Sequence, residues 1–238
     1  MSGHYPVTLA GETLWLLADK AVYWPRQAIL MIADAHFGKA AAYRKLGQPV
    51  PRGTTASNLQ NLDRLLHAYP VEHLIFLGDF FHAPESLSVG TLAALNAWRE
   101  ATGTLQVTLI RGNHDRRAGD PPAYLRMAVV NEPLRVGPFA LAHEPDVRPG
   151  SHVLAGHVHP AYRLRGLGRQ RLRLPCFHLG AQVSLLPAFG AFTGGFNVEA
   201  GPGERIYVVG DGQVWPVNQA TGVGGGSSGM VGLPGSSG

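Results

Sequence analysis

Short apolar runs recur along the chain, and each is followed at once by a cluster of Asp, His, Asn or Gly. Their length and their content of aliphatic residues are typical of buried β-strands. The runs are AILMIA before Asp34, LIFL before Gly78, VTLI before Arg111, FALA before His143 and HVLA before Gly156. Since open α/β folds place their sites at the carboxyl ends of strands, we expect the polar clusters to meet at one edge of a sheet.

Two segments between the first three runs have the residue spacing of amphipathic helices. Their apolar faces consist of Leu59, Leu62, Leu65 and Leu66 in a helix that begins near Thr54, and of Leu92, Leu95 and Trp98 in a second helix. Strands and helices therefore alternate early in the chain, whereas strand-like segments dominate after about residue 128. This order predicts an α/β domain with mixed sheets.

The end of the chain differs in composition from the rest. Residues 1–217 are expected to form a single domain. Beyond them, residues 218–238 are dominated by Gly and Ser. Such a composition cannot bury a core, so the sequence predicts a flexible Gly/Ser-rich C-terminal tail.

Hydrophobic residues make up 45% of the chain and charged residues 15%, a composition typical of a folded globular protein. No apolar run approaches the ~20 residues of a membrane-spanning helix. No signal peptide is evident, because Asp19 and Lys20 interrupt the nearest apolar candidate. The single cysteine, Cys176, cannot form an internal disulfide, which suits a reducing compartment. We therefore expect a cytoplasmic protein with no membrane partner.

The chain carries a formal net charge of +4, and its basic residues are arginines except for Lys20, Lys39 and Lys45. The planar guanidinium matches phosphate oxygens, so this bias fits a phosphate-rich partner. An arginine-favouring codon usage explains the same bias equally well. The basic composition alone therefore does not decide the class of partner.

Each polar cluster has an ordinary explanation when taken alone. Gly-Asp and Gly-Asn pairs are common in turns, and a histidine after a strand is often a surface residue. The clusters are Asp34-Ala35-His36, Gly78-Asp79-Phe80-Phe81-His82, Gly112-Asn113-His114-Asp115, Ala142-His143-Glu144 and Gly156-His157-Val158-His159-Pro160. Together they follow strands in a fixed order and supply the oxygen and nitrogen ligands that two divalent cations need. The set therefore predicts a metal site.

The series DAH, GDFFH, GNHD, AHE and GHVHP resembles the calcineurin-like metallophosphoesterase superfamily, from Asp34 through Pro160. A closer resemblance, over nearly the whole chain, is to the ligase-associated DNA damage response endonuclease PdeM family. It is carried by DAHFGKAAAYRKLGQPVPRGT, LGDFFHA, RGNHDR, GHVHPAYRLRG, LPCF and LPAFGAFTGG. The resemblance implies a four-layer αββα sandwich of two mixed β-sheets flanked by helices. Two positions depart from common superfamily patterns: His82 stands where Asp is frequent, and the fourth motif reads AHEP.

The resemblance also implies two divalent metal ions and their ligands. It assigns Asp34, His36 and His159 to one ion, Asn113, His143 and His157 to the other, and Asp79 to a bridging position. A carboxylate can offer oxygen to two cations held ~3.5–4 Å apart, which agrees with that bridge. Imidazole ligands favour transition metals, so Mn²⁺ is the expected ion, with Fe or Zn²⁺ as alternatives.

The same resemblance places a catalytic group next to a ligand. His114 is expected to donate a proton or a hydrogen bond to the departing oxygen. His82 and Asp115 are expected to orient the ligands. In the expected mechanism, a hydroxide that bridges the two metals attacks phosphorus in line.

A basic segment follows the last two histidines directly. The sequence AYRLRGLGRQRLRLP predicts a β-hairpin, in which Arg163 and Arg165 alternate with leucine on one strand and Arg171 and Arg173 on the other. A solvated face explains this pattern about as well as contact with substrate phosphates. The position of the hairpin favours phosphate contact slightly, and Arg111 flanks the third cluster in a similar way.

These observations predict a metal-dependent phosphodiesterase or endonuclease that hydrolyses nucleic acid, with DNA as the expected substrate. A role in DNA repair, and partners in an ATP-dependent DNA ligase and a DEXH helicase, are implied by the resemblance only. One alternative is a phosphatase or phosphodiesterase that acts on a small nucleotide-type ester, since the same metals would serve. Another is a catalytically inactive binding module of the same fold, which the presence of all seven ligands and His114 disfavours.

Overall fold

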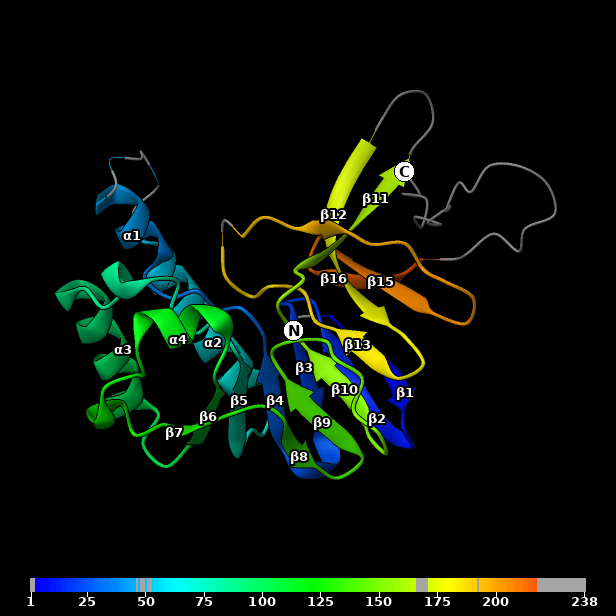
Figure 1. Cartoon of the computed structure of the whole chain (residues 1–238), viewed down its shortest axis with the longest axis horizontal. Helices are drawn as coiled ribbons and strands as arrows, with labels where there is room; N and C mark the ends of the chain where they lie inside the picture. Colours follow the sequence, from blue (N-terminus) through cyan, green and yellow to red (C-terminus); the bar gives the residue numbers. More distant parts are fainter. Residues whose placement is uncertain are drawn as a thin grey trace, which may run out of the picture.

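The computed structural model describes residues 3–45, 47, 50, 53–165, 171–191 and 193–217. Two β-sheets lie face to face, and helices cover the outer face of the first sheet (Figure 1). The first sheet has seven strands in sequence order: β1 His4–Leu9, β2 Glu12–Leu17, β3 Ala21–Trp24, β4 Ile29–Ile32, β5 His73–Leu77, β6 Gln106–Ile110 and β7 Ala128–Val130. Strands β1 to β4 pair antiparallel and β4 to β7 pair parallel, so this sheet is mixed.

The second sheet is also mixed and has the order β14-β11-β12-β13-β10-β9-β8, with β15 pairing β12 and β16. Its strands are β8 Leu134–Val136, β9 Phe139–Ala142, β10 His152–Ala155, β11 Pro160–Arg165, β12 Arg171–Leu179, β13 Val183–Leu185, β14 Phe196–Asn197, β15 Arg205–Gly210 and β16 Gln213–Pro216. The central strands β9, β10 and β13 are parallel to one another. All five apolar runs of the sequence therefore form strands, as predicted: β4, β5, β6, β9 and β10.

Four α-helices and three 3₁₀ turns complete the described residues. They are α1 Lys39–Lys45, α2 Thr54–Ala68, α3 Val89–Ala101 and α4 Asn113–Ala118, with η1 Pro25–Gln27, η2 Pro84–Ser86 and η3 Ala123–Leu125. The two predicted helices are α2 and α3. Their predicted apolar residues pack in the core beneath the helices, with Leu62, Leu65 and Leu95 fully buried and Leu66 and Leu92 half-buried against it.

Alternation along β4 explains how one strand serves two layers. Leu30 and Ile32 face the helices, where they pack with α2 and α3 residues, while Met31 faces the second sheet. Because successive side chains of a strand point to opposite faces, a fully apolar strand is the pattern expected of a sheet covered on both sides. Between the sheets, the Trp24 ring meets Phe139 edge-on, with centroids 5.1 Å apart.

The strand ends decide where the site forms. Since β4, β5 and β6 are parallel neighbours, their carboxyl ends lie at one edge of the first sheet. A segment after β13 joins that edge to the second sheet: the Phe189 N–H donates to Ala33 O and the Gly190 N–H donates to Asp34 O. The loops that follow β9 and β10 are thereby held opposite those that follow β4, β5 and β6.

The predicted α/β fold with two mixed sheets is confirmed. Among the described residues the α-helices all precede β7, so the helical layer expected against the second sheet is not found there. The chain after Leu125 is too rich in strand-forming runs to supply one. No helix of the described ranges has the length and apolarity needed to cross a bilayer. The predicted tail, residues 218–238, lies outside the described residues, and the single-domain limit at residue 217 stays a prediction.

Candidate metal centre

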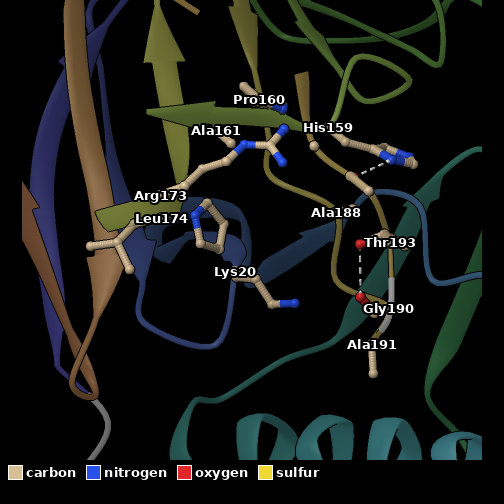
Figure 2. A pocket seen from close by; sticks show the side chains of 13 residues that line it. Lys20, His159, Pro160, Ala161, Arg173, Leu174, Ala188, Gly190, Ala191 and Thr193 are labelled. Atoms are coloured by element: carbon tan, nitrogen blue, oxygen red, sulfur yellow. Dashed lines mark hydrogen bonds between the residues drawn. The ribbon is translucent and has the colours of Figure 1, made fainter. Parts of the chain in front are cut away.

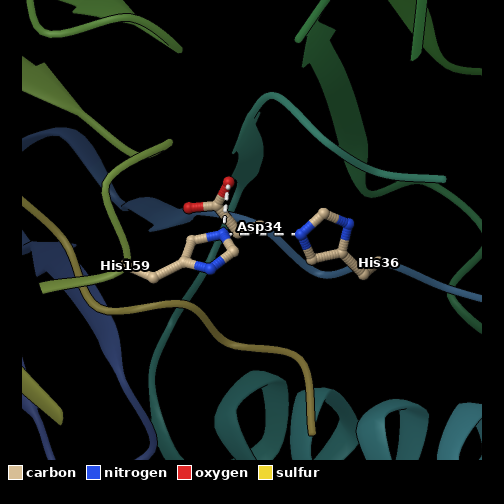
Figure 3. Close-up of side chains that lie close together, drawn as sticks. All are labelled: Asp34, His36 and His159. Atoms are coloured by element: carbon tan, nitrogen blue, oxygen red, sulfur yellow. Dashed lines mark hydrogen bonds and ion pairs between the residues drawn. The ribbon is translucent and has the colours of Figure 1, made fainter. Parts of the chain in front are cut away.

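The first predicted set of ligands converges at the end of β4. Asp34 and His36 follow this strand, and His159 reaches them from the loop after β10 (Figure 3). The Nε2 atoms of His36 and His159 are 3.4 Å apart, and His159 Nε2 lies 3.3 Å from Asp34 Oδ1. A ligand atom from each of the three lies within 4.8 Å of the others, so the trio could hold one metal ion.

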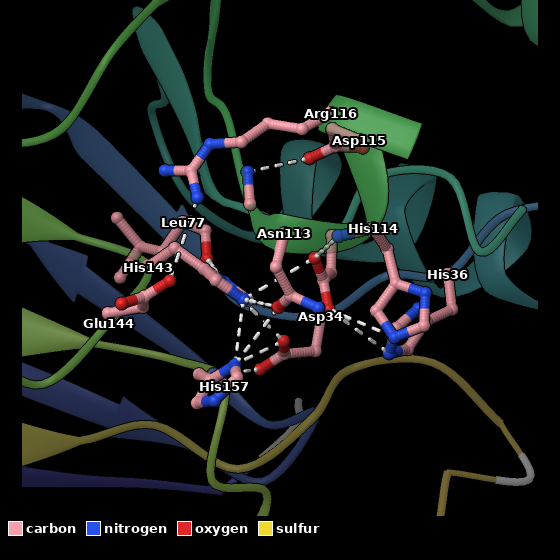
Figure 4. Close-up of polar contacts among 12 residues, drawn as sticks. Asp34, His36, Leu77, Asn113, His114, Asp115, Arg116, His143, Glu144 and His157 are labelled. Carbon is pink, nitrogen blue, oxygen red and sulfur yellow. Dashed lines mark hydrogen bonds and ion pairs between the residues drawn. The ribbon is translucent and has the colours of Figure 1, made fainter. Parts of the chain in front are cut away.

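The second predicted set converges beside the first. Asn113 Oδ1, at the start of α4, lies 2.8 Å from His143 Nε2 and 3.1 Å from His157 Nδ1. The two imidazole nitrogens are themselves 3.1 Å apart (Figure 4). The three atoms thus face a common point, although one comes from the first sheet and two from the second.

Asp79, at the end of β5, lies between the two sets. Its Oδ1 is 3.4 Å from His143 Nε2, and its Oδ2 is 3.9 Å from His36 Nε2. This position is the one expected of a bridging carboxylate. Asp34 also faces both sets, since its Oδ1 lies 3.8 Å from His143 Nδ1. Asp34, Asp79 and His143 consequently form a second group that could hold a metal.

Backbone carbonyls fix the orientation of three histidines. The Nδ1–H of His143 donates to Leu77 O at 3.1 Å, that of His159 to Gly194 O at 3.1 Å, and that of His114 to His82 O at 2.6 Å. Because a carbonyl only accepts, each bond requires the proton on Nδ1 and leaves Nε2 facing the centre. In His143, a lone pair of Nε2 then points at the Asn113 oxygen across 2.8 Å. Such facing lone pairs repel unless a positive charge lies between them.

Three glycines make the close packing of the ligands possible. A Cβ on Gly78 would lie 2.3 Å from the His143 ring, and one on Gly112 would lie 2.3 Å from Asp79 Oδ1. A Cβ on Gly156 would lie 2.6 Å from Asp34 Oδ2. Each glycine of the Gly-Asp, Gly-Asn and Gly-His motifs therefore leaves room for a ligand that another strand supplies.

Five candidate ligands have left-handed backbone conformations. Their φ angles are 53° for Asp34, 46° for His36, 50° for Asp79, 68° for His157 and 51° for His159. This conformation is uncommon for residues with a Cβ and costs roughly 1–2 kcal/mol at each position. Hydrogen bonds between the loops hold it in place: the Asp34 N–H donates to Gly78 O and the His36 N–H to Asp79 O. Strain concentrated in this way is characteristic of functional sites.

The charges of the site favour a cation. Burial raises the pKa of the Asp79 carboxyl, and the nearby Asp34 carboxylate raises it further. Burial lowers the pKa of His36, with Lys39 contributing in the same direction. For His159, burial acts to lower the pKa, but the hydrogen bond and charge of Asp34 outweigh it and the pKa is raised. Two buried carboxylates surrounded by imidazole nitrogens form a donor set that suits divalent transition metals.

His82 and Asp115 contact residues next to the candidate ligands. The His82 ring stacks on His114, with centroids 4.8 Å apart, and its carbonyl accepts the His114 Nδ1–H. Asp115 is fully buried and accepts the N–H groups of Phe81 and Gly112, both at 3.0 Å. Asp115 therefore joins the loops after β5 and β6 through their backbone, and His82 positions His114; that they orient the metal ligands stays a prediction.

Arg111 does not lie free at the site. Its guanidinium donates two hydrogen bonds to Asp120, both of 2.7 Å, and a third to Asn131 at 3.0 Å. A bidentate carboxylate occupies the fork that a substrate phosphate would need. This ion pair ties the loop before α4 to residues 120 and 131, and the phosphate contact of Arg111 stays a prediction.

The predicted arginine hairpin is present as β11 and β12. The strands pair antiparallel with Arg163 opposite Arg173 and Arg165 opposite Arg171, so these positions share one face of the hairpin. Arg163, Arg171 and Arg173 are exposed. The same face carries Ala161 and Pro175, which line a cavity beside His159. The arginine face thus continues from the edge of the candidate metal centre.

The sequence did not reveal two lysines near the site. Lys39, three residues after His36, lies near enough to Asp34 and Asp79 for their charges to raise its pKa against the lowering by burial. Lys20 lines the cavity beside His159. Lys39 carried a signal, since it directly follows the first motif. Lys20 lies in the turn between β2 and β3 and carried none.

Comparison with known proteins agrees with this arrangement. The calcineurin-like phosphoesterase family matches residues 28–178, which is more than half of the chain and includes all the candidate ligands. The chain belongs to this family. As a calcineurin-like phosphoesterase with groups of residues that could hold divalent metals, it is a metal-dependent phosphoesterase. The predicted resemblance to the superfamily is thereby confirmed.

Two solved structures are similar to this phosphoesterase to different degrees. The crystal structure of the nuclease MPE from Pseudomonas putida is 51% identical over 90% of this chain and 100% of its own, with a TM-score of 0.81. The structure of AQ665, a protein of unknown function from Aquifex aeolicus, is 19% identical over 59% of this chain and 82% of its own. Its TM-score is 0.38. No curated protein gives a significant match.

Proposed function

We propose that this phosphoesterase is a two-metal phosphodiesterase that cleaves nucleic acid, with DNA as the expected substrate. The observation that carries the proposal is the continuity between the candidate metal centre and the exposed arginine face of β11 and β12. A small phosphate ester would need only the centre. A polynucleotide would also use a row of cations beside it. The similarity to a nuclease, MPE, supports the same choice.

The seven candidate ligands fit two divalent cations. Asp34, His36 and His159 would hold one, Asn113, His143 and His157 the other, and Asp79 would lie between them. When bound, the metals would stabilise charge on the phosphate oxygens and increase the acidity of water. The nitrogen-rich donor set favours Mn²⁺, Fe or Zn²⁺ over Mg²⁺ or Ca²⁺, and Mn²⁺ is the expected ion.

His114 is the residue proposed to serve the leaving group. Its Nε2 lies 3.9 Å from Asp79 Oδ2, and its side chain is 31% exposed, so a substrate can reach it. The Nδ1–H bond to His82 O and the stacked His82 ring hold the imidazole in one orientation. A positioned imidazole can hold or transfer a proton at the oxygen that departs.

A substrate panel tests the proposed function. Single-stranded DNA, double-stranded DNA, RNA and a small chromogenic diester should each be assayed with Mn²⁺ under identical conditions. We expect cleavage of the chromogenic diester and of at least one nucleic acid, and no cleavage in EDTA. Turnover of the small diester alone would favour an enzyme of small nucleotide-type esters, and no turnover of any substrate would favour an inactive binding module.

Mn²⁺ should stabilise the fold, because the candidate ligands of each metal come from both sheets. At a hundredfold excess over Kd, two sites contribute about 5 kcal/mol to the free energy of unfolding. For a domain of this size that raises the Tm by roughly 10–20 °C. Thermal unfolding of EDTA-treated protein, with and without added Mn²⁺, measures the effect. A Tm unaffected by Mn²⁺, Fe²⁺ and Zn²⁺ would contradict the metal assignment.

Removing positive charge from the hairpin should weaken nucleic-acid binding. Arg163→Ala/Arg171→Ala is expected to reduce affinity for all DNA sequences and to flatten the log–log salt dependence by about 0.7–0.9 for each phosphate that the hairpin ceases to neutralise. Turnover of the small diester supplies the comparison, because such a substrate has no charged chain to reach the hairpin. Arg26→Ala/Arg135→Ala, at exposed positions elsewhere, is the matched control. Equal salt slopes in all three proteins would make the arginine face a solvated surface.

The biological setting remains a prediction of the family resemblance. A role in DNA repair and association with an ATP-dependent DNA ligase and a DEXH helicase follow from it, whereas the expected cytoplasmic location rests on the sequence. The buried position of Cys176, the single cysteine, suits a reducing compartment. Co-purification of the tagged protein with the ligase or the helicase tests the proposed partners.

A further inference from the structure

A cavity of about 230 Å³ opens directly beside the candidate metal centre. His159 forms one wall, and Ala188, Gly190, Ala191 and residues 193–195 form another (Figure 2). The Nδ1–H of His159 donates to Gly194 O, so the wall and the candidate ligand are joined. The cavity is therefore located on the His159 side of the centre, away from Asn113 and His143.

Lys20 supplies one cation to the cavity. Its Nζ donates to Phe189 O at 2.8 Å, a neutral acceptor. The adjacent carboxylate, Asp19, forms its ion pair with Arg64 at 3.1 Å. Burial lowers the pKa of Lys20 to about 8, and the charge of Asp19 only partly opposes this. A half-buried ammonium bonded to a carbonyl is a position where an anion would be stabilised.

Arg173 supplies a second cation from β12. Its Nε donates to Asn197 Oδ1 at 2.9 Å, which again is a neutral partner. Its Nη2 lies against Gly195, where a Cβ would come within 3.2 Å. Small residues form much of the remaining wall: Ala161, Ala188, Gly190, Ala191, Gly194 and Gly195. A cavity with two cations and few bulky side chains suits a phosphate group together with the sugars to which it is joined.

We propose that this cavity binds the phosphate adjacent to the scissile phosphodiester of a polynucleotide, through Lys20 and Arg173. The inference rests on the proposed function and deepens it, because it defines the substrate as one with at least two neighbouring phosphates. The cavity is smaller than the about 300–1,000 Å³ of typical small-molecule sites. It therefore accepts one segment of a longer substrate. Beyond the cavity, the rest of the polynucleotide would lie along the arginine face of β11 and β12.

A pair of matched chromogenic substrates tests the subsite. Thymidine 5′-(4-nitrophenyl phosphate) is compared with its 3′-phosphorylated form, and the 3′-(4-nitrophenyl phosphate) isomer with its 5′-phosphorylated form, in Mn²⁺. In the parent protein, the second phosphate should raise kcat/KM at least about tenfold in one of the two pairs, as expected for one charge-assisted hydrogen bond. Lys20→Met and Arg173→Met should each reduce this ratio. Lys45→Met, which removes the same charge from an exposed position on α1, should not.

A binding measurement keeps the subsite testable apart from catalysis. In EDTA, Lys20→Met should weaken the binding of fluorescent oligothymidylate and reduce its salt slope by about 0.7 relative to both the parent and Lys45→Met. If neither form of either substrate is turned over and no nucleic acid is cleaved, the proposed function fails, and the binding data alone decide the subsite. An unchanged ratio in Lys20→Met and Arg173→Met, or equal binding by Lys20→Met and Lys45→Met, would overturn the proposal. A second phosphate without effect in either parent pair would also overturn it.

Discussion

Asp79→Asn is expected to lower turnover by at least about a thousandfold while the protein stays folded. The carboxylate lies between the two candidate metal sets, 3.4 Å from His143 Nε2 and 3.9 Å from His36 Nε2. An amide removes the negative charge that would hold two cations together, and stabilisation of that kind is worth several kcal/mol, or about a factor of ten for each 1.4 kcal/mol. Asparagine tolerates the left-handed backbone of this position, and its side-chain oxygen can still accept the His114 N–H.

The matched control for Asp79→Asn is Asp211→Asn. Asp211 also has a left-handed backbone, with φ of 52°, but it lies exposed in the turn between β15 and β16. The same chemical change should therefore have no effect on turnover there. Turnover of a chromogenic diester, metal content and thermal unfolding should be measured on both variants. Undiminished turnover of Asp79→Asn at saturating Mn²⁺ would remove Asp79 from the centre of the mechanism.

His114→Ala is expected to slow cleavage of substrates with poor leaving groups by ~10²–10⁴-fold. The imidazole is held by His82 and presents Nε2 to the open side of the centre. An alkoxide leaving group, as in DNA, needs a proton from such a residue, whereas 4-nitrophenolate leaves without one. Loss of His114 should therefore affect thymidylyl-thymidine much more than a 4-nitrophenyl diester.

The comparison of the two leaving groups separates chemistry from structure. His114→Ala should retain its metals, because His114 is not among the candidate ligands. His67→Ala removes an exposed histidine from α2 and serves as the control. Rates should be measured for both substrates at saturating Mn²⁺. Equal losses on both would mean that His114 acts on binding or on the fold instead of on the leaving group.

Strand positions and the ligand clusters could be predicted from the sequence because both depend on local patterns. The runs before Asp34, Gly78 and His143 are apolar throughout, as strands covered on both faces require. Parallel pairing of β4, β5 and β6 then brings the ends of these runs together. The polar clusters after β4, β5 and β6 lie together because parallel neighbouring strands end at the same edge of the sheet.

Interactions between distant segments could not be predicted in this way. Nothing near Lys20 in the sequence indicates Phe189, 169 residues away, to which its ammonium donates. The ion pair of Arg111 with Asp120 could not be predicted either, because the two residues are nine positions apart and their pairing depends on how the loop after α4 folds. The sequence also did not predict that the described helices cover only the first sheet. Which sheet a helix covers depends on how the two whole sheets pack, not on a local pattern.

The left-handed backbone of the five candidate ligands affects which substitutions would accumulate at these positions if the activity were no longer under selection. At such positions glycine is free of the Cβ clash, so replacing a ligand with glycine relieves roughly 1–2 kcal/mol of strain while it removes a metal donor. Once selection for activity is relaxed, this substitution would meet the least resistance at His157, because its side chain is exposed and little packing is lost with it. Descendants with an inactive centre should therefore accumulate glycine at His157 before they accumulate it at Asp34 or His36, which are buried.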